Sequence, residues 1–329
     1  MSRRLLIAAL PLALSLTLAH AAQPEDAFER VQRPGSVDLR GEYDLSGLTI
    51  PEDEIHTLLP RDAIPALTDP KLEPVGEAGW LGETDRVISV EVGGEAVAAP
   101  LKILNFHEIV NMTVGGEAVA ATYCPLCDSA TLVSRVVPTG KTDEDGEPET
   151  ITLELGVSGA LYNSNVLMYD RQTLGLWSQL GMRWVSGKLA GTALRHLPLR
   201  VVSWREFKAA HPGGRVVSRE TGHERPYDRP AYVSYFSTDR LLVPVRGVGD
   251  DLEERKTLGL GVMSAGRAWF IPATVIGERY ELETPEGVVV ASSADGGIQV
   301  LSAPEGAFTA QTFYYSWSAF HPNVEVVRE

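Results

Sequence analysis

Cysteine is scarce in this 329-residue sequence: only Cys124 and Cys127 occur, three residues apart. A small scaffold held together by disulfides needs more cysteines at wider spacing, so that class of protein is excluded. Three interpretations of the pair remain: a disulfide that closes a short loop, a redox-active pair, or part of a metal site.

Long apolar segments are lacking except near the start. Arg3 and Arg4 precede an uncharged apolar run, residues 5–18, which is shorter than the roughly 20 residues of a membrane span. Residues 19–21 fit the small-x-small rule for cleavage. We therefore expect residues 1–22 to be a signal peptide, with a general secretory signal favoured over a twin-arginine signal. The mature chain should have no membrane span and should act in the periplasm or as a secreted protein.

Basic residues are too few to balance the acidic ones. The chain has 29 Lys and Arg against 44 Asp and Glu, a formal net charge of −15. An acidic field of this size disfavours binding to nucleic acid or to anionic lipid. The expected partner is instead a small molecule or another periplasmic protein of unknown identity.

Glycine and proline are plentiful, at 31 and 21 residues, which favours many turns over a helical bundle. Prolines prevent long helices in residues 23–80, so this segment is expected to be an irregular lead-in. From residue 87, short alternating apolar runs with glycine turns indicate hairpins. We predict a β-rich α+β fold with a few short helices, one over 101–111 and one that begins with the capping box Ser203–Glu206.

The sequence also repeats itself. The octapeptide at residues 92–99 recurs unchanged at 114–121, and each copy indicates a strand, a Gly-Gly turn and a strand. A longer echo relates residues 94–100, Ser203-Trp204, His211-Pro212 and Val216-Val217 to residues 266–272, Ser316-Trp317, His321-Pro322 and Val326-Val327. We predict two related subdomains: residues 81–220, which contain the cysteine pair, and a shorter one at 221–329. One active centre per chain follows, because the second half has no cysteine.

The cysteine pair is expected at the tip of a hairpin. A strand at 118–123 leads into Cys124-Pro125-Leu126-Cys127, and a β-like run at 131–137 follows. In thioredoxin-like proteins, by contrast, a helix N-terminus lowers the pKa of the first cysteine. A Cys-Pro-x-Cys turn between strands resembles the metal knuckle of rubredoxins and zinc ribbons. Since a second cysteine pair is absent, the other ligands would be His, Met, Asp or Glu.

Few residues can complete such a site. His107, beside Glu108 on the expected helix, is a candidate ligand or catalytic base, and Glu108 is a second catalytic candidate. His321 and Met168 are further candidate ligands; Met168 would suit copper. Copper is favoured, with zinc or iron as alternatives. Each of these side chains also fits a structural role in the core or at a helix end.

A second cluster of polar and aromatic residues lies between 156 and 179 and has the composition of a pocket wall. With Tyr123, the expected lining residues are Ser158, Tyr162, Asn163, Asn165, Tyr169, Asp170, Arg171 and Trp177. Turn-forming asparagines and a surface Asp–Arg pair are the alternative interpretation.

Several of these segments together resemble an exported prokaryotic family, domain of unknown function family 3179, over about residues 63–327. The resemblance rests on residues 104–111, 122–127, 156–159, 161–171, 176–179 and 320–322. Asp128 stands where the family usually has glycine, and Phe106 where tryptophan is common. The resemblance implies export and marks these segments, but it implies no particular reaction.

Three hypotheses about function follow. The leading one is an exported metal-binding protein, which as an enzyme would be a metal-dependent oxidoreductase, with Cys124, Cys127 and His107 as ligands. The second is a periplasmic thiol–disulfide oxidoreductase. The third is a binding module without catalytic activity, in which Cys124 and Cys127 form a structural disulfide.

Overall fold

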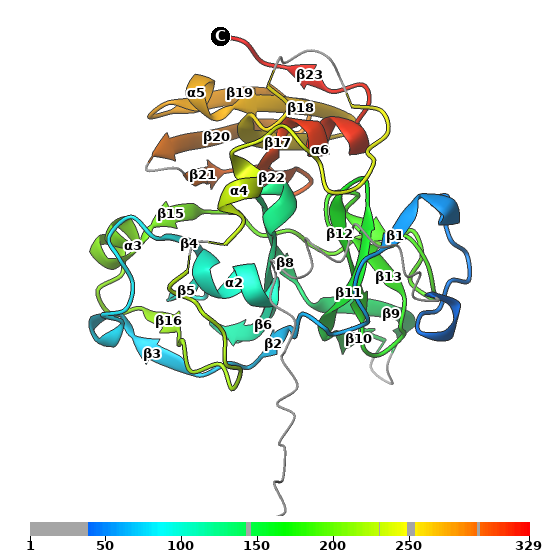
Figure 1. The fold of residues 1–329 in the computed structure, drawn as a ribbon, viewed down its shortest axis with the longest axis horizontal. Helices are drawn as coiled ribbons and strands as arrows, with labels where there is room; N and C mark the ends of the chain where they lie inside the picture. Colours follow the sequence, from blue (N-terminus) through cyan, green and yellow to red (C-terminus); the bar gives the residue numbers. More distant parts are fainter. Residues whose placement is uncertain (1–38, 143–145, 230, 249–253, 295–296) are drawn as a thin grey trace, which may run out of the picture.

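The structure is a computed structural model that describes residues 39–142, 146–229, 231–248, 254–294 and 297–329. The expected signal peptide lies outside these residues. Strands dominate the described chain and the helices are short, which confirms the prediction of a β-rich α+β fold. In Figure 1, two groups of strands lie side by side, and a third group, β17 to β23, lies above them.

The strands form three larger sheets and two small ones. The eight-stranded sheet has the order β2 (Leu67–Thr68), β6 (Ile109–Val114), β7 (Glu117–Cys124), β8 (Ser129–Ser134), β22 (Phe308–Phe313), β17 (Leu258–Ser264), β18 (Arg267–Pro272) and β23 (Glu325–Val326). One five-stranded sheet has the order β15 (Val201–Ser203), β4 (Arg86–Val92), β5 (Glu95–Pro100), β16 (Arg215–Val217) and β3 (Leu72–Pro74). The other has the order β1 (Ile55–Thr57), β11 (Leu155–Tyr162), β12 (Asn165–Asp170), β13 (Leu176–Ser178) and β14 (Arg183–Trp184). The small sheets pair β9 (Val136–Thr142) with β10 (Pro148–Thr152), and join β19 (Tyr280–Thr284), β20 (Gly287–Ala294) and β21 (Gly297–Ser302).

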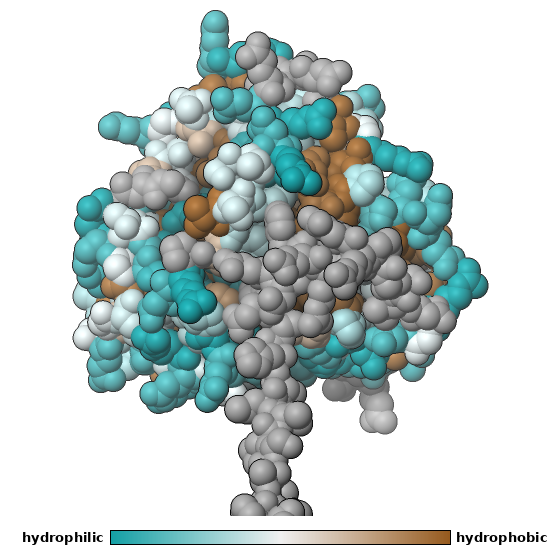
Figure 2. All heavy atoms as spheres, in the orientation of Figure 1, coloured by the Kyte–Doolittle hydropathy of each residue, from teal (hydrophilic) through white to brown (hydrophobic). Residues whose placement is uncertain are grey.

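The α-helices are α2 (Leu101–His107), α3 (Trp204–Ala210), α4 (Val233–Phe236), α5 (Ala273–Ile276) and α6 (Tyr314–Phe320). Single 3₁₀ turns are η1 (Leu39–Gly41), η2 (Glu52–Glu54), η3 (Val75–Glu77) and η4 (Pro125–Cys127). No helix among the described residues has the length and apolar character needed to cross a membrane. In Figure 2, hydrophilic residues are frequent towards the edges of the face, and apolar residues appear in several separate areas.

Both copies of the repeated octapeptide form hairpins, as predicted. The Gly-Gly turns lie between β4 and β5 and between β6 and β7. The two turns also pack on each other: a Cβ on Gly115 would lie 2.1 Å from the carbonyl oxygen of Val92, and one on Gly93 2.6 Å from that of Gly115. Glycine is therefore needed at the first turn position of both copies.

The helix predicted over 101–111 is shorter than expected. It ends at His107, and Glu108 adopts a left-handed conformation with φ 57°. The β-branched pair Ile109-Val110 then enters β6, where pairing with β7 overrides the helical apolar pattern. The helix capped by Ser203 and Glu206 forms as predicted and ends before His211.

Two groups of four strands pair in the same way. One has the order β15-β4-β5-β16 and the other β22-β17-β18-β23. The last pair in each group is parallel, with Val97 opposite Arg215 in one and Trp269 opposite Glu325 in the other. The two Ser-Trp pairs of the sequence echo are not equivalent, because Ser203 caps α3 whereas Ser316 lies inside α6.

Candidate functional site

The cysteine pair lies at a hairpin tip, as predicted. Strand β7 ends at Cys124, η4 makes the turn, and β8 leaves it. Both thiols are free and buried, and their Sγ atoms are 3.7 Å apart. A disulfide needs a separation of about 2.05 Å, so the two sulfurs are in contact without a bond.

Asp128, the residue after the turn, has a left-handed backbone with φ 44°. Its carboxylate accepts hydrogen bonds from the Tyr123 hydroxyl and from the Arg86 guanidinium, each at 2.8 Å. A glycine would adopt this backbone with less strain, but it would leave the largely buried Arg86 without its carboxylate. The ion pair explains why aspartate is accommodated here.

The two sulfurs differ in their surroundings. Cys127 Sγ lies 3.2 Å from the Ser316 hydroxyl and 3.6 Å from both the Tyr315 hydroxyl and the Asn165 amide nitrogen. Burial acts to raise the pKa of Cys127, but hydrogen bonds from Cys124 and from these three side chains outweigh it and lower that pKa. Burial, the hydrogen bond to Cys127 and the charges of Cys127 and Glu108 raise the pKa of Cys124. Cys127 is therefore the more acidic of the two thiols.

The proton that Cys124 donates towards Cys127 can also be bound to Cys127 itself. Cys127 Sγ is also 3.0 Å from the carbonyl oxygen of Ser164, an acceptor for Cys127 in its thiol form. A proton transferred from Cys124 to Cys127 would therefore still be hydrogen-bonded. The geometry thus allows either sulfur to carry the negative charge.

A buried polar network fixes the orientation of Asn165. Its Oδ1 accepts a hydrogen bond from the Leu180 backbone N–H, so its amide nitrogen must face Cys127. The two hydrogens of that nitrogen are shared between the sulfur and two nearer acceptors, the Gln179 side-chain oxygen at 2.9 Å and the Ser129 hydroxyl at 3.1 Å. The donor to the sulfur is thereby held in place by β8, β12 and the chain after β13.

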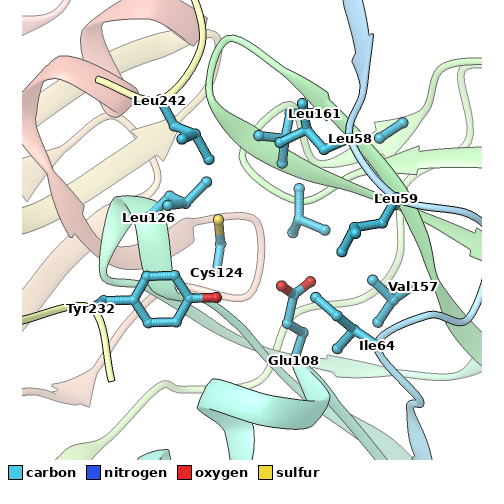
Figure 3. A pocket seen from close by; sticks show the side chains of 13 residues that line it. Leu58, Leu59, Ile64, Glu108, Cys124, Leu126, Val157, Leu161, Tyr232 and Leu242 are labelled. Atoms are coloured by element: carbon cyan, nitrogen blue, oxygen red, sulfur yellow. The ribbon is translucent and has the colours of Figure 1, made fainter. Parts of the chain in front are cut away.

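Cys124 faces an apolar pocket that lies between the eight-stranded sheet and β11. Its lining residues are Leu58, Leu59, Ile64, Glu108, Cys124, Leu126, Val157, Gly159, Ala160, Leu161, Val166, Tyr232 and Leu242. The cavity volume is about 50 Å³, several times the 10–15 Å³ or so that one water molecule requires. Figure 3 shows the Glu108 carboxyl, the Tyr232 hydroxyl and the Cys124 sulfur directed into this space.

Glu108 is the acidic residue of this pocket. Burial and the nearby Cys127 raise its pKa to about 8, and its Oε2 atom has no hydrogen-bond partner among the described residues. Its carbonyl oxygen accepts a 2.7 Å hydrogen bond from the Tyr123 N–H, which ties the end of α2 to the cysteine strand. A carboxyl group with this pKa can take up or release a proton near neutral pH.

A bulge in β11 builds the opposite wall. The pairing of β11 with β12 shifts between Val157 and Ala160, and the Gly159 carbonyl accepts hydrogen bonds from the N–H groups of Leu58 and Leu59. Gly159 has φ +75°, and a Cβ there would lie 2.1 Å from the Leu59 carbonyl oxygen. Glycine is needed at this position to dock the lead-in segment against β11.

His107 is turned to other partners. Its Nδ1 lies 2.7 Å from the Pro65 carbonyl oxygen, so this nitrogen carries the proton, and Nε2 accepts a 2.6 Å hydrogen bond from the Tyr227 hydroxyl. Burial lowers the pKa of His107 to about 4, so the ring is neutral. Both nitrogens are thus engaged, and neither offers a free lone pair to a metal at the cysteines.

The other candidate ligands are placed as follows. Met168 is buried in the same apolar core as the two cysteines. His321 follows α6, packs at a tilt against Trp317 with ring centroids 4.1 Å apart, and lines a separate cleft beside Met263. Within the described parts of the chain, no group of three or more His, Cys, Asp or Glu side chains is arranged to hold a metal ion.

Of the predicted lining residues, Asn165 contacts Cys127, while Tyr123 bonds Asp128 beside the turn. Trp177 packs in the surrounding core. The remaining members of the set have contacts that shape the neighbouring strands and turns: Ser158 with Leu167, Tyr162 with Phe320, Asn163 with Ala319 and Arg246, Tyr169 and Arg171 with Asp62, and Asp170 with Thr173 and Trp184.

Sequence reasoning missed the donors to Cys127 that come from α6, and it missed Tyr232 at the pocket. Tyr315 and Ser316 lie 188 and 189 residues away along the chain. Their only signal was a run of aromatic residues that also suits a buried helix. Gln179 and Ser164 belong to segments that were candidates in the sequence. Ser164 reaches Cys127 from the turn between β11 and β12, and Gln179 reaches the site from the end of β13.

The fold and the site define a β-rich protein with a buried, reduced cysteine pair beneath an apolar pocket. The family model for DUF3179, described as proteins of unknown function, matches residues 61–307, and the chain belongs to this family. No curated protein and no solved structure matches the chain.

Proposed function

We propose that this protein is a thiol–disulfide oxidoreductase with Cys124 and Cys127 as its redox centre, acting in the periplasm or as a secreted protein. The observation that carries the proposal is the unequal pair: Cys127, whose sulfur is surrounded by hydroxyl and amide groups that lower its pKa, lies 3.7 Å from Cys124, which faces a pocket and has a raised pKa. Side chains from α6 and β12 lower the pKa of Cys127 here, in place of the helix N-terminus used by thioredoxin-like proteins.

The first half of the proposed reaction takes place at Cys124. Its proton passes to the Cys127 thiolate, and the new Cys124 thiolate attacks one sulfur of a substrate disulfide. A mixed disulfide forms, the substrate S–S bond breaks, and the departing thiolate takes the proton of Glu108.

The second half takes place at Cys127. Its proton passes to the Glu108 carboxylate, its sulfur attacks Cys124 Sγ, and the second substrate thiolate leaves. Two electrons have then moved from the cysteine pair to the substrate, and a dithiol reductant returns the pair to its starting state. The Sγ atoms must approach from 3.7 Å to about 2.05 Å.

The test is the reduction potential of the pair, measured by mass spectrometry after thiol alkylation in dithiothreitol buffers of graded redox state. We expect a reversible two-electron transition, a trapped mixed disulfide in Cys127→Ser, and no covalent adduct in Cys124→Ser. A pair that stays disulfide-bonded until the protein unfolds would overturn the proposal and favour a structural disulfide in a binding module.

Metal binding is the second candidate, and two observations favour it. The 3.7 Å between the sulfurs is close to the roughly 3.8 Å edge of a tetrahedron with metal–sulfur bonds of about 2.3 Å. Glu108, which lines the same pocket as Cys124, also has a buried carboxyl oxygen that finds no partner within the described ranges. The donors would be Cys124 and Cys127, and Glu108 would join them only after its side chain moves, because no three such side chains among the described residues are arranged to hold a metal ion. Copper is favoured, with zinc or iron as alternatives.

Elemental analysis of untagged protein separates the two candidates. One equivalent of a single metal, lost in both Cys124→Ser and Glu108→Gln but kept in His107→Gln, would favour the metal site. Protein that holds no metal after anaerobic addition of copper, zinc or iron would exclude it.

We also infer that the chain contains two related subdomains, as its sequence echo predicts. The shared strand orders and the shared parallel register of β5–β16 and β18–β23 support this inference. So do His211 and His321, which follow α3 and α6 and pack at a tilt against the rings of Phe207 and Trp317, four residues before each. In this interpretation, the sheet of β11 to β14 lies within the first subdomain.

A further inference from the structure

We propose that the substrate is a small, uncharged disulfide with apolar substituents, an inference that rests on the proposed thiol–disulfide activity. The observations that carry it are the access to Cys124 and the chemistry of the pocket wall. Neither observation depends on which sulfur is charged.

Access to the sulfurs excludes bulky substrates. Cys124 is 1% exposed and Cys127 is fully buried. A disulfide on the surface of a folded protein therefore cannot approach Cys124 Sγ to the distance that attack requires. The cavity of about 50 Å³ in front of Cys124 admits only a small group, such as a short alkyl chain next to the reacting sulfur.

The wall of the pocket selects against charge. Leucine, isoleucine, valine and alanine side chains form most of it, with contributions from the lead-in segment, β11, β12 and residue 242. Its polar side chains are those of Glu108, Cys124 and Tyr232, and the described part of the chain contributes no Lys, Arg or His to the lining. A carboxylate on the substrate would lose its hydration without gaining a cation, which is strongly unfavourable.

The wall of the pocket is formed by segments that lie far apart in the sequence. The β11 bulge and Gly159 bring Leu58 and Leu59 from the lead-in segment over the cysteine turn. On the other side, Tyr232 and Leu242 come from the chain between the two groups of paired strands. Four segments distant in sequence thus enclose one thiol with apolar groups, an arrangement that favours apolar ligands.

The test compares four disulfides as oxidants of the reduced, full-length protein: diethyl disulfide, dithiodiglycolate, cystamine and glutathione disulfide. The rate of loss of free thiol is divided by the rate for free N-acetylcysteine with the same disulfide, which corrects for intrinsic reactivity. We expect the normalised rate for diethyl disulfide to exceed the other three by at least tenfold. Equal or faster normalised reaction of any charged disulfide would overturn the inference while leaving the proposed activity intact.

A variant adds an independent readout. Leu58→Lys places a cation at the pocket wall and should raise the normalised rate for dithiodiglycolate at least fivefold, whereas Leu58→Met, the matched control, should not. An unchanged preference in Leu58→Lys would show that the wall does not select the substrate. If none of the four disulfides oxidises the wild-type pair, the proposed activity itself is wrong and this inference falls with it.

Discussion

At the scale of single residues, the two cysteines differ because different groups surround them. Both are buried, and burial alone would keep both protonated. Cys127 differs because hydroxyl and amide donors meet its sulfur, whereas Cys124 meets the apolar pocket and Glu108. The division of roles within the pair is therefore a property of neighbouring side chains, which substitutions can change one at a time.

Ser316→Ala tests this account. The hydroxyl of Ser316 is the nearest side-chain donor to Cys127, at 3.2 Å. A hydrogen bond to a charged group contributes about 1.5–3 kcal/mol, so its loss should raise the pKa of Cys127 by about one to two units. The pH dependence of the thiolate ultraviolet absorbance measures this shift. Ser318→Ala is the control, since Ser318 lies in the same helix and donates to the Tyr315 carbonyl oxygen; an equal shift in both variants would contradict the account.

The substitution Asp128→Gly compares two contributions to stability: the strain of the left-handed backbone at residue 128 and the interactions of its carboxylate. Glycine relieves the left-handed strain, about 1 kcal/mol, but it removes the carboxylate that binds Arg86 and Tyr123. Because Arg86 is largely buried, we expect a net loss of about 2–3 kcal/mol in the free energy of unfolding. Urea denaturation measures it, with Asp128→Asn to separate charge from shape. A glycine variant as stable as the wild type would show that the ion pair contributes little.

At the scale of elements, the β11 bulge determines whether the pocket has its outer wall. Gly159 and Gly266 have nearly equal φ angles, +75° and +76°, but a Cβ meets the Leu59 carbonyl oxygen at Gly159 and open space at Gly266. Gly159→Ala should therefore destabilise the protein by about 2–4 kcal/mol and Gly266→Ala by about 1 kcal/mol. Thermal unfolding of both variants checks this; equal losses would mean that the bulge tolerates displacement of the lead-in segment.

The elements themselves were largely predictable. Gly-Gly turns between alternating apolar runs indicated the hairpins at 92–99 and 114–121, and the capping box indicated α3, because these signals are local. The end of α2 was not predictable, because Glu108 leaves the helix to suit the pairing of β6 with β7. Because the helix ends at His107, the Glu108 carboxyl lies in the pocket, whereas His107 is hydrogen-bonded to Tyr227.

At the scale of the whole molecule, the site joins segments that no local pattern connects. The motif at 124–127 and the residue Glu108 were recognisable as candidates from the sequence. Ser316, Tyr232 and Leu58 reach them only because the eight-stranded sheet, the sheet of β11 to β14 and the chain between 231 and 248 meet at one place. The sequence identifies the residues that can react at such a site. It does not identify the distant residues that surround them in the fold.

That convergence buries Glu108 and makes the stability of the whole molecule depend on pH. Its pKa is about 8 when folded, against an ordinary value of 4.5. Between these values the folded protein holds a proton that the unfolded chain has released. The stabilising contribution is therefore complete below pH 4.5, falls as pH rises towards 8, and changes no further above it.

Glu108→Gln removes this titration and keeps the shape of the side chain. The free energy of unfolding of the wild type, relative to this variant, should fall by about 4–5 kcal/mol between pH 4.5 and 8. Urea denaturation across this range measures the difference, with the exposed Glu149→Gln as control. Parallel stability curves for wild type and Glu108→Gln would mean that the Glu108 carboxyl is ionised in the folded protein. The proton that the proposed reaction delivers to its first leaving thiolate would then have to come from another group.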